Sequence, residues 1–162
     1  VPILPANLLL TTAKGEKRLM NYESLADGGF ATGTMMGSGG FIVLDEDQCV
    51  VRHTMTLARF YHHESCGQCS PCREGTGWME RILKKIEYGK GAMKDIDLLW
   101  DIQRKIEGNT ICALGDAAAW PVAAAIRHFR DEFEWHINNP EDCLRKNYGL
   151  AGYADEIHVP VT

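Results

Sequence analysis

The sequence predicts a mainly α-helical protein, in which a C-terminal four-helix bundle follows the end of a small α+β domain. Two observations predict this fold: apolar residues recur at helical spacing in four segments, and short loops separate those segments. Three cysteines crowd one of the loops, which indicates a metal centre carried by the bundle. We therefore expect an α+β remnant at 1–46, the bundle with its centre at 47–138, and a C-terminal extension at 139–162.

Residues 1–46 differ from the rest in their glycines, prolines and short apolar runs. The segment 8–12 predicts one strand, 41–44 predicts a second, buried strand, and 22–25 predicts a short helical turn. The glycine cluster at 33–40 does not match the spacing of a dinucleotide-binding loop, and a strand follows it instead of a helix. We expect it to form a turn.

Four helices are predicted from residue 47 onward. The first runs to His62, with carboxylates at 45–47 placed to cap it, and the next two run over 73–88 and 94–107. The fourth pattern opens at Asp116. Because proline is tolerated only near a helix start, its regular part should begin close to Pro121. The apolar residues expected to pack in the core are Val50, Val51, Met55, Leu57, Ala58, Tyr61, Trp78, Met79, Ile82, Leu83, Ile86, Ile96, Leu99, Ile102, Ile106, Trp120, Val122, Ala125, Ile126, Phe129, Phe133 and Ile137.

The remaining polar positions carry weaker signals. His62 and His63 suit the C-terminal end of the first helix, where they complement its dipole. His128 and His136 lie among charges on the fourth helix and should be at the surface. A short helix is predicted to run from 139 to 147.

Six cysteines in 162 residues would allow three disulfides in a secreted protein. Cys66, Cys69 and Cys72 are too crowded for mutual bridging, so a reducing compartment and joint coordination of a metal fit better. Cys49 should be a small buried thiol and Cys143 a free thiol, and neither is expected to be a ligand.

A fourth ligand can come from Cys112. A helix rises about 1.5 Å per residue, so the segment 73–88 climbs roughly 24 Å and the segment 94–107 descends roughly 21 Å. A turn at 89–91 permits an antiparallel hairpin, which returns Cys112 to the neighbourhood of Cys72.

The loop chemistry favours an iron–sulfur cluster. Three cysteines plus one is the ferredoxin-like pattern, whereas zinc sites of four cysteines usually come as two separated pairs. Cys72 lies at a helix start, which favours an anionic group, and Arg73 adds a cation. Gly67 and Gly75 let the backbone approach the sulfurs, and Pro71 stiffens the step into the helix. Structural zinc is the alternative, and reduced thiols without a metal are the third reading.

The segment 64–75 reads E-S-C-G-Q-C-S-P-C-R-E-G and resembles the signature of the NADH-binding flavoprotein (F, 51 kDa) subunit of respiratory complex I, NADH:quinone oxidoreductase. Flavin subunits of NAD-linked hydrogenases and formate dehydrogenases share it. The resemblance covers most of 22–134, fades after 138, and includes the segments 99–100, 106–108, 110–116, 119–122 and 126–129.

The resemblance implies that Cys66, Cys69, Cys72 and Cys112 bind one [4Fe–4S] cluster, and that 1–46 ends a ubiquitin-like domain. It also implies that the cluster takes single electrons from reduced FMN. Its partners would be the thioredoxin-like [2Fe–2S] subunit and the large iron–sulfur subunit. The implied location is cytoplasmic, in a peripheral arm on the inner face of the membrane, or on the matrix side in a mitochondrion.

Nothing in the sequence matches the FMN- and NADH-binding domain of that family, so we expect a piece of a longer protein. The chain alone should not turn over NADH, although its parent would be an enzyme. The alternatives are a zinc-stapled, partner-binding bundle, or the same module of a hydrogenase or formate dehydrogenase. The net charge of −5 argues against a nucleic-acid partner. The sequence contains no apolar run of about 18 residues, so membrane insertion is not predicted.

Overall fold

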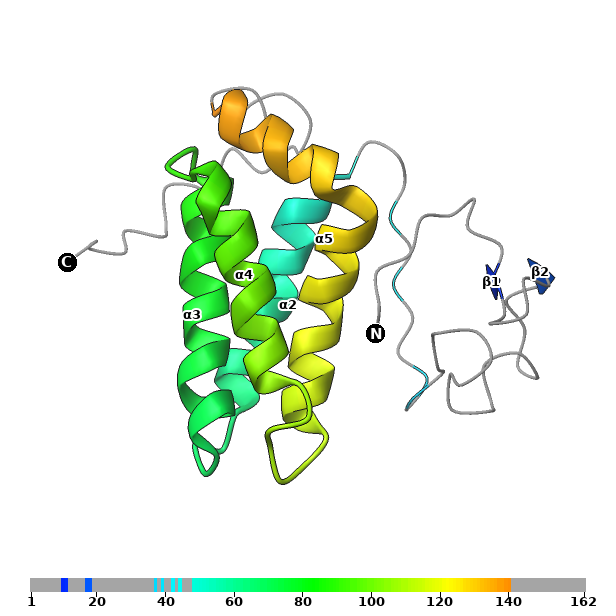
Figure 1. Ribbon diagram of the computed structural model, residues 1–162, viewed down its shortest axis with the longest axis vertical. Coiled ribbons are helices and arrows are strands. Elements are labelled where there is room, and N and C mark those ends of the chain that lie inside the picture. Colours follow the sequence, from blue (N-terminus) through cyan, green and yellow to red (C-terminus); the bar gives the residue numbers. More distant parts are fainter. Residues whose placement is uncertain are drawn as a thin grey trace.

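The described part of the computed structural model forms four helices, as the sequence predicts. They are α2 (Val50–Glu64), α3 (Ser70–Glu87), α4 (Met93–Ile106) and α5 (Leu114–Asn138), and Figure 1 shows them packed as a bundle. The structure describes 48–140 continuously, and before them Leu10–Thr11, Lys17–Arg18, Gly37, Gly39, Ile42 and Leu44.

Consecutive helices run in opposite directions, which places the connecting loops alternately at the two ends of the bundle. In Figure 1 the α2–α3 and α4–α5 loops lie together at the lower end, and the α3–α4 turn lies at the upper end. This arrangement is the antiparallel hairpin of α3 and α4 that the sequence predicts. The two loops that carry the clustered cysteines and Cys112 therefore share one end.

The core lies between the four helices and consists mainly of the predicted apolar residues. Val51, Met79, Leu83, Ile96, Leu99 and Phe133 are fully buried. Trp78 was expected in the core but is 49% exposed, because Gly77 and Met79 occupy the buried face of α3 beside it. The cluster of packed residues comprises Cys49, Val50, Val51, Ala58, Met79, Leu83, Ile86, Ile96, Leu99, Ile102, Ile106, Ala118, Ala119, Val122, Ala125, Ile126 and Phe133.

Helix α2 begins later than predicted, and its cap is not one of the carboxylates at 45–47, which lie outside the described residues. Cys49 is the N-cap: its Sγ accepts a hydrogen bond from the Arg52 backbone N–H at 3.4 Å. The Glu132 carboxylate on α5 accepts another, from the Val50 N–H at 3.3 Å. These two acceptors satisfy amides that the first turn leaves without helical partners.

Helix α5 also departs from the prediction. It begins at Leu114, so Pro121 lies inside it, buried, rather than near its start. The alanine-rich sequence around Pro121 has high helix propensity and is largely buried, which offsets the lost backbone hydrogen bond. Further on, Phe129 has φ −134° and ψ 29°, a break in the helix. Figure 1 shows the last part of α5 turning there to cross the upper end of the bundle.

Before the bundle, β1 (Leu10–Thr11) pairs antiparallel with β2 (Lys17–Arg18), with Leu10 opposite Arg18. Strand β1 falls within the segment predicted as a strand. Of the segment predicted as a buried strand, 41–44, the described residues Ile42 and Leu44 are irregular and Ile42 is 61% exposed, while the other two lie outside the described residues. A strand needs a pairing partner, and within the described residues β1 and β2 pair only with each other. The predicted turn at 22–25, nearly all of the glycine cluster, and Cys143 lie outside the described residues.

Candidate metal centre

The loop between α2 and α3 positions three cysteines around the start of α3. Cys69 is the N-cap residue, and Cys72 lies in the first turn behind Pro71. Gly67 has φ +77°, a conformation that glycine adopts without strain, and it lets the loop reverse between Cys66 and Cys69. The first turn of α3 is closed by the Arg73 N–H, which donates to the Cys69 carbonyl at 2.8 Å.

The three cysteines of this loop differ in how deeply they are buried. Cys66 is exposed, Cys69 is partly buried and Cys72 is buried, and none of them forms a disulfide. The Ser65 hydroxyl lies 3.2 Å from the Cys72 Sγ, within hydrogen-bond distance. The Gly67 N–H donates to the same hydroxyl at 3.4 Å, so Ser65 ties the loop backbone to the innermost sulfur.

The α4–α5 loop brings the fourth predicted ligand to this end of the bundle. The Ile111 backbone N–H donates to the Cys69 Sγ at 3.4 Å, which places the neighbouring residue, Cys112, beside the cysteine loop. Cys112 is a free, exposed thiol, and its carbonyl accepts a hydrogen bond from the Thr110 hydroxyl at 2.9 Å. The Asp116 carboxylate holds the other end of the loop by accepting from the Gly108 N–H at 2.7 Å.

Arg73 has a different role from the one the sequence indicates. Its guanidinium Nη1 donates to the Gly67 carbonyl at 2.8 Å and its Nε donates to Glu74 at 3.0 Å. Arg73 therefore clamps the cysteine loop as well as adding positive charge. Ser65 and the Ile111 amide are also parts of the site that sequence reasoning missed. Ser65 precedes a cysteine directly, which is a weak signal, but no sequence signal marks the Ile111 amide.

Gly75 also acts differently from the prediction, because it faces α4 rather than the sulfurs. A Cβ atom placed there would lie 2.7 Å from the Ile106 side chain, which is almost fully buried. The missing side chain thus allows α3 and α4 to approach closely, one turn from Cys72 on one helix and just before the Cys112 loop on the other.

His62 lies in the last turn of α2, as expected, but its imidazole bonds across the bundle. Its Nδ1 lies 2.5 Å from the Glu80 carboxylate on α3, and Lys84 lies 2.6 Å from the same group. Burial raises the pKa of Glu80, but the hydrogen bonds from Lys84 and His62 outweigh it and hold that pKa below its usual value. This ionic group joins α2 to α3. His136, expected at the surface, is buried and lies at the other end of the bundle, beside Cys49 at the start of α2.

The donor set fits an iron–sulfur cluster. Four thiols come from two loops at one end of the bundle, and soft thiolate ligands suit iron–sulfur clusters. The Ile111 amide already points at one sulfur, which is the kind of contact that tunes a cluster's reduction potential. Fold and donors together define a class of protein: a helical bundle whose end loops present cysteines suited to hold a redox centre.

Comparison with known families agrees with this class. A model described as the NADH-ubiquinone oxidoreductase-F iron-sulfur binding region matches residues 52–136, which is more than half of the chain. The chain belongs to this family, and the cofactor of the family's region is a [4Fe–4S] cluster. None of the described helices combines the length and the apolar character needed to cross a membrane.

Individual relatives of the chain agree with this family assignment. The chain is 44% identical over 151 residues to the F subunit of the NADH-quinone oxidoreductase of Rickettsia typhi, covering 93% of this chain and 31% of the relative. It is 46% identical over 136 residues to the mitochondrial 51 kDa subunit of NADH-ubiquinone oxidoreductase of Neurospora crassa, covering 84% of this chain and 26% of that protein. The chain thus spans less than a third of the length of either relative.

A solved structure shares the fold. The NAD+-reducing [NiFe]-hydrogenase in its H2-reduced state matches with a TM-score of 0.60 and 32% identity, covering 66% of this chain and 18% of that one. The match extends the similarity to an NAD+-reducing hydrogenase.

Proposed function

We propose that this chain is the electron-carrying module of an NADH:quinone oxidoreductase F subunit, with Cys66, Cys69, Cys72 and Cys112 as the four cluster ligands. The single observation that carries the ligand assignment is the 3.4 Å contact between the Ile111 amide and the Cys69 sulfur, because it joins the two cysteine-bearing loops. A bound [4Fe–4S] cluster supplies one-electron chemistry to a flavin that reacts with NADH in two-electron steps.

The chain's own residues hold and shield this centre. Arg73 and Ser65 fix the loop around Cys66 and Cys69, while α3 buries Cys72. Cys66 and Cys112 lie at the surface of this end, so a redox partner can approach their side of the centre closely. We assign that approach to neighbouring subunits of the peripheral arm, the thioredoxin-like [2Fe–2S] subunit and the large iron–sulfur subunit, with the arm on the inner face of the membrane.

The surrounding chain follows the domain arrangement of the family in this proposal. Residues 1–46 would end the ubiquitin-like domain, 47–138 form the bundle, and 139–162 extend it. FMN and NADH would bind in a domain of the parent subunit outside this chain, so the chain alone should not oxidise NADH. The parent is assigned to complex I over a hydrogenase because the F subunits are 42–46% identical and the hydrogenase is 32% identical.

The test is metal and sulfide analysis of the chain purified without oxygen, followed by reduction and electron paramagnetic resonance. The proposal predicts about four irons and four sulfides per chain, as a cubane requires, and a reversible one-electron signal. A chain that is colourless and redox-silent, and that holds zinc without sulfide in its four cysteines, would establish the zinc-stapled alternative and reject the proposal.

A further inference from the structure

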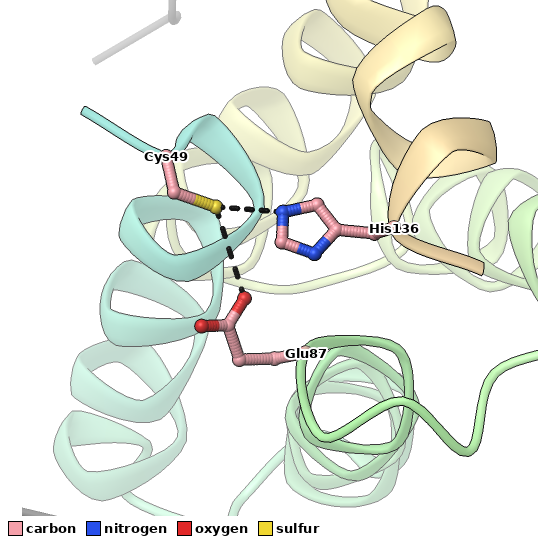
Figure 2. Close-up of side chains that lie close together, drawn as sticks. All are labelled: Cys49, Glu87 and His136. Atoms are coloured by element: carbon pink, nitrogen blue, oxygen red, sulfur yellow. Dashed lines mark hydrogen bonds between the residues drawn. The ribbon is translucent and has the colours of Figure 1, made fainter. Parts of the chain in front are cut away.

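Three side chains that bind metals well meet at the end of the bundle remote from the two cysteine-bearing loops. The Cys49 Sγ lies 2.9 Å from the His136 Nε2 and 3.8 Å from a Glu87 carboxylate oxygen. All three residues are at least 95% buried, and their ligand atoms lie within 4.8 Å of one another. Figure 2 shows the thiol, the imidazole and the carboxylate pointing toward a common centre.

Each ligand comes from a different helix, and the break in α5 brings them together. Cys49 caps the start of α2 and Glu87 is the last residue of α3. The change of direction at Phe129 carries the end of α5 across the bundle, and His136 on this segment lies beside both of them. Phe133 is fully buried and anchors this crossing segment.

We propose that Cys49, Glu87 and His136 bind a zinc ion, which fastens the crossing segment of α5 to α2 and α3. Zinc accepts sulfur, nitrogen and oxygen ligands, and three protein ligands plus one water complete its tetrahedral shell. Zinc–ligand bonds of about 2.0–2.3 Å at tetrahedral angles put neighbouring ligand atoms about 3.5 Å apart. The observed separations of 2.9 and 3.8 Å bracket that value, so small side-chain movements suffice.

The charges also suit a divalent cation. A thiolate and a carboxylate balance the two positive charges of zinc, and a neutral imidazole adds none, so the buried complex is neutral and burial costs it little. Binding releases to solvent the thiol proton of Cys49 and, where the Glu87 carboxyl is protonated, its proton as well.

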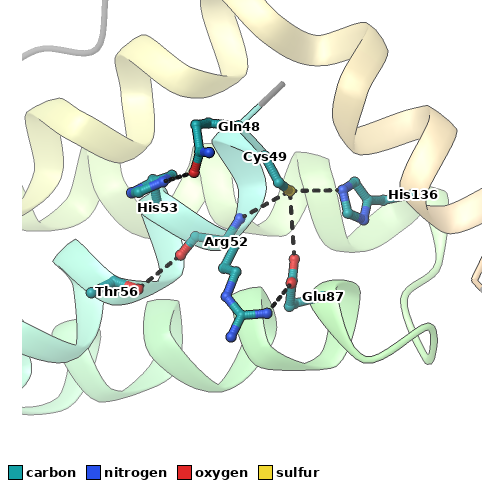
Figure 3. Close-up of polar contacts among 7 residues, drawn as sticks. All are labelled: Gln48, Cys49, Arg52, His53, Thr56, Glu87 and His136. Carbon is teal, nitrogen blue, oxygen red and sulfur yellow. Dashed lines mark hydrogen bonds and ion pairs between the residues drawn. The ribbon is translucent and has the colours of Figure 1, made fainter. Parts of the chain in front are cut away.

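Arg52 forms a long ion pair with Glu87, which offsets the charge of this buried carboxylate only in part. Its Nη1 lies 3.8 Å from the other carboxylate oxygen, and Figure 3 shows it on the outer side of the cluster. Burial raises the pKa of Glu87 to about 7 in spite of Arg52, which agrees with a carboxylate short of positive charge.

The test uses the whole chain, purified without oxygen with its iron–sulfur centre, incubated with zinc chloride and freed of excess metal. We expect one zinc per chain by mass spectrometry. Zinc-edge X-ray absorption should show one sulfur at about 2.3 Å with nitrogen and oxygen neighbours at about 2.0–2.1 Å. Zinc captured by the four cysteines of the two loops, Cys66, Cys69, Cys72 and Cys112, would instead show four sulfurs.

The variants are chosen to keep the fold. Cys49→Ser retains a good N-cap for α2 while removing the thiolate, and should weaken zinc binding at least tenfold with the iron and sulfide content unchanged. His136→Gln should do the same, and His128→Gln on the same helix is its control.

Three results would overturn the zinc site: no zinc bound by the unaltered chain, a four-sulfur shell, or equal zinc affinity in Cys49→Ser and the unaltered chain. Iron and sulfide are measured in the same samples, so failure of this site and failure of the proposed iron–sulfur function are read separately.

Discussion

At the scale of the single residue, Arg73 restrains the conformation of the cysteine loop. Its guanidinium spans from the first turn of α3 back to the Gly67 carbonyl, across the glycine that reverses the loop. Cys66 is exposed and Cys69 only partly buried, so apolar packing does little to hold the loop, and this hydrogen bond restricts the positions that the two cysteines can take. The proposed ligands are thereby held in place before a cluster binds.

Replacing Arg73 with alanine should therefore loosen the site without unfolding the bundle. The lost bond is half exposed and worth about 1 kcal/mol, which corresponds to roughly a fivefold faster loss of iron on exposure to oxygen. The rate is followed by the decay of visible absorption. Arg81→Ala, an exposed arginine on the same helix, is the control. Equal rates in the two variants would show that the clamp contributes nothing.

The sequence predicts the clustered thiols at one end of the bundle but not the side-chain group at the other end. The cysteine spacing and the hairpin length predict the loop-borne thiols, because that information is local or depends on helix geometry alone. Cys49, Glu87 and His136 come from three helices and no spacing joins them. Cys49 as a helix cap was equally hidden, since cysteine is not a usual capping residue.

At the scale of the element, the contact between Gly75 on α3 and Ile106 on α4 sets the distance between the two helices beside the centre. A methyl group at Gly75 would meet Ile106 side-chain atoms at 2.7 Å in a fully packed region. The helices would have to separate, and with them the loops that carry Cys72 and Cys112.

We expect Gly75→Ala to lower the free energy of unfolding by about 1–3 kcal/mol, even though alanine is the better helix former. Its iron content should fall as well. Gly77→Ala is the comparison on the same helix: its Cβ would lie 3.0 Å from the partly exposed His62 ring, so a shift of that ring costs at most the part-buried pair with Glu80 and leaves the core packing intact. Thermal unfolding followed by circular dichroism compares the two. A Gly75→Ala variant as stable as Gly77→Ala would contradict the close-approach argument.

The helices themselves follow closely from periodicity, and α4 lies within one residue of its predicted bounds. Periodicity could not predict that α5 continues through Pro121 or that it breaks at Phe129. A buried, alanine-rich surrounding keeps the helix intact through the proline, and a break appears at a phenylalanine that no local rule marks. Both outcomes depend on packing against other helices, and the burial of His136 follows from the second.

At the scale of the whole molecule, the bundle separates two kinds of site. One end presents loops with exposed thiols, suited to electron exchange with a partner, and the other end closes over a buried thiol–imidazole–carboxylate group. A continuous apolar core lies between the two ends and fixes the position of the two cysteine-bearing loops relative to each other.

The most direct test of this account is an anomalous-difference map from crystals of the chain grown without oxygen, with data collected at the iron absorption edge. The account predicts one compact iron peak bonded by the sulfurs of Cys66, Cys69, Cys72 and Cys112. An iron peak that lacks the Cys112 sulfur among its neighbours, or that lies at Cys49 and His136 instead, would contradict it.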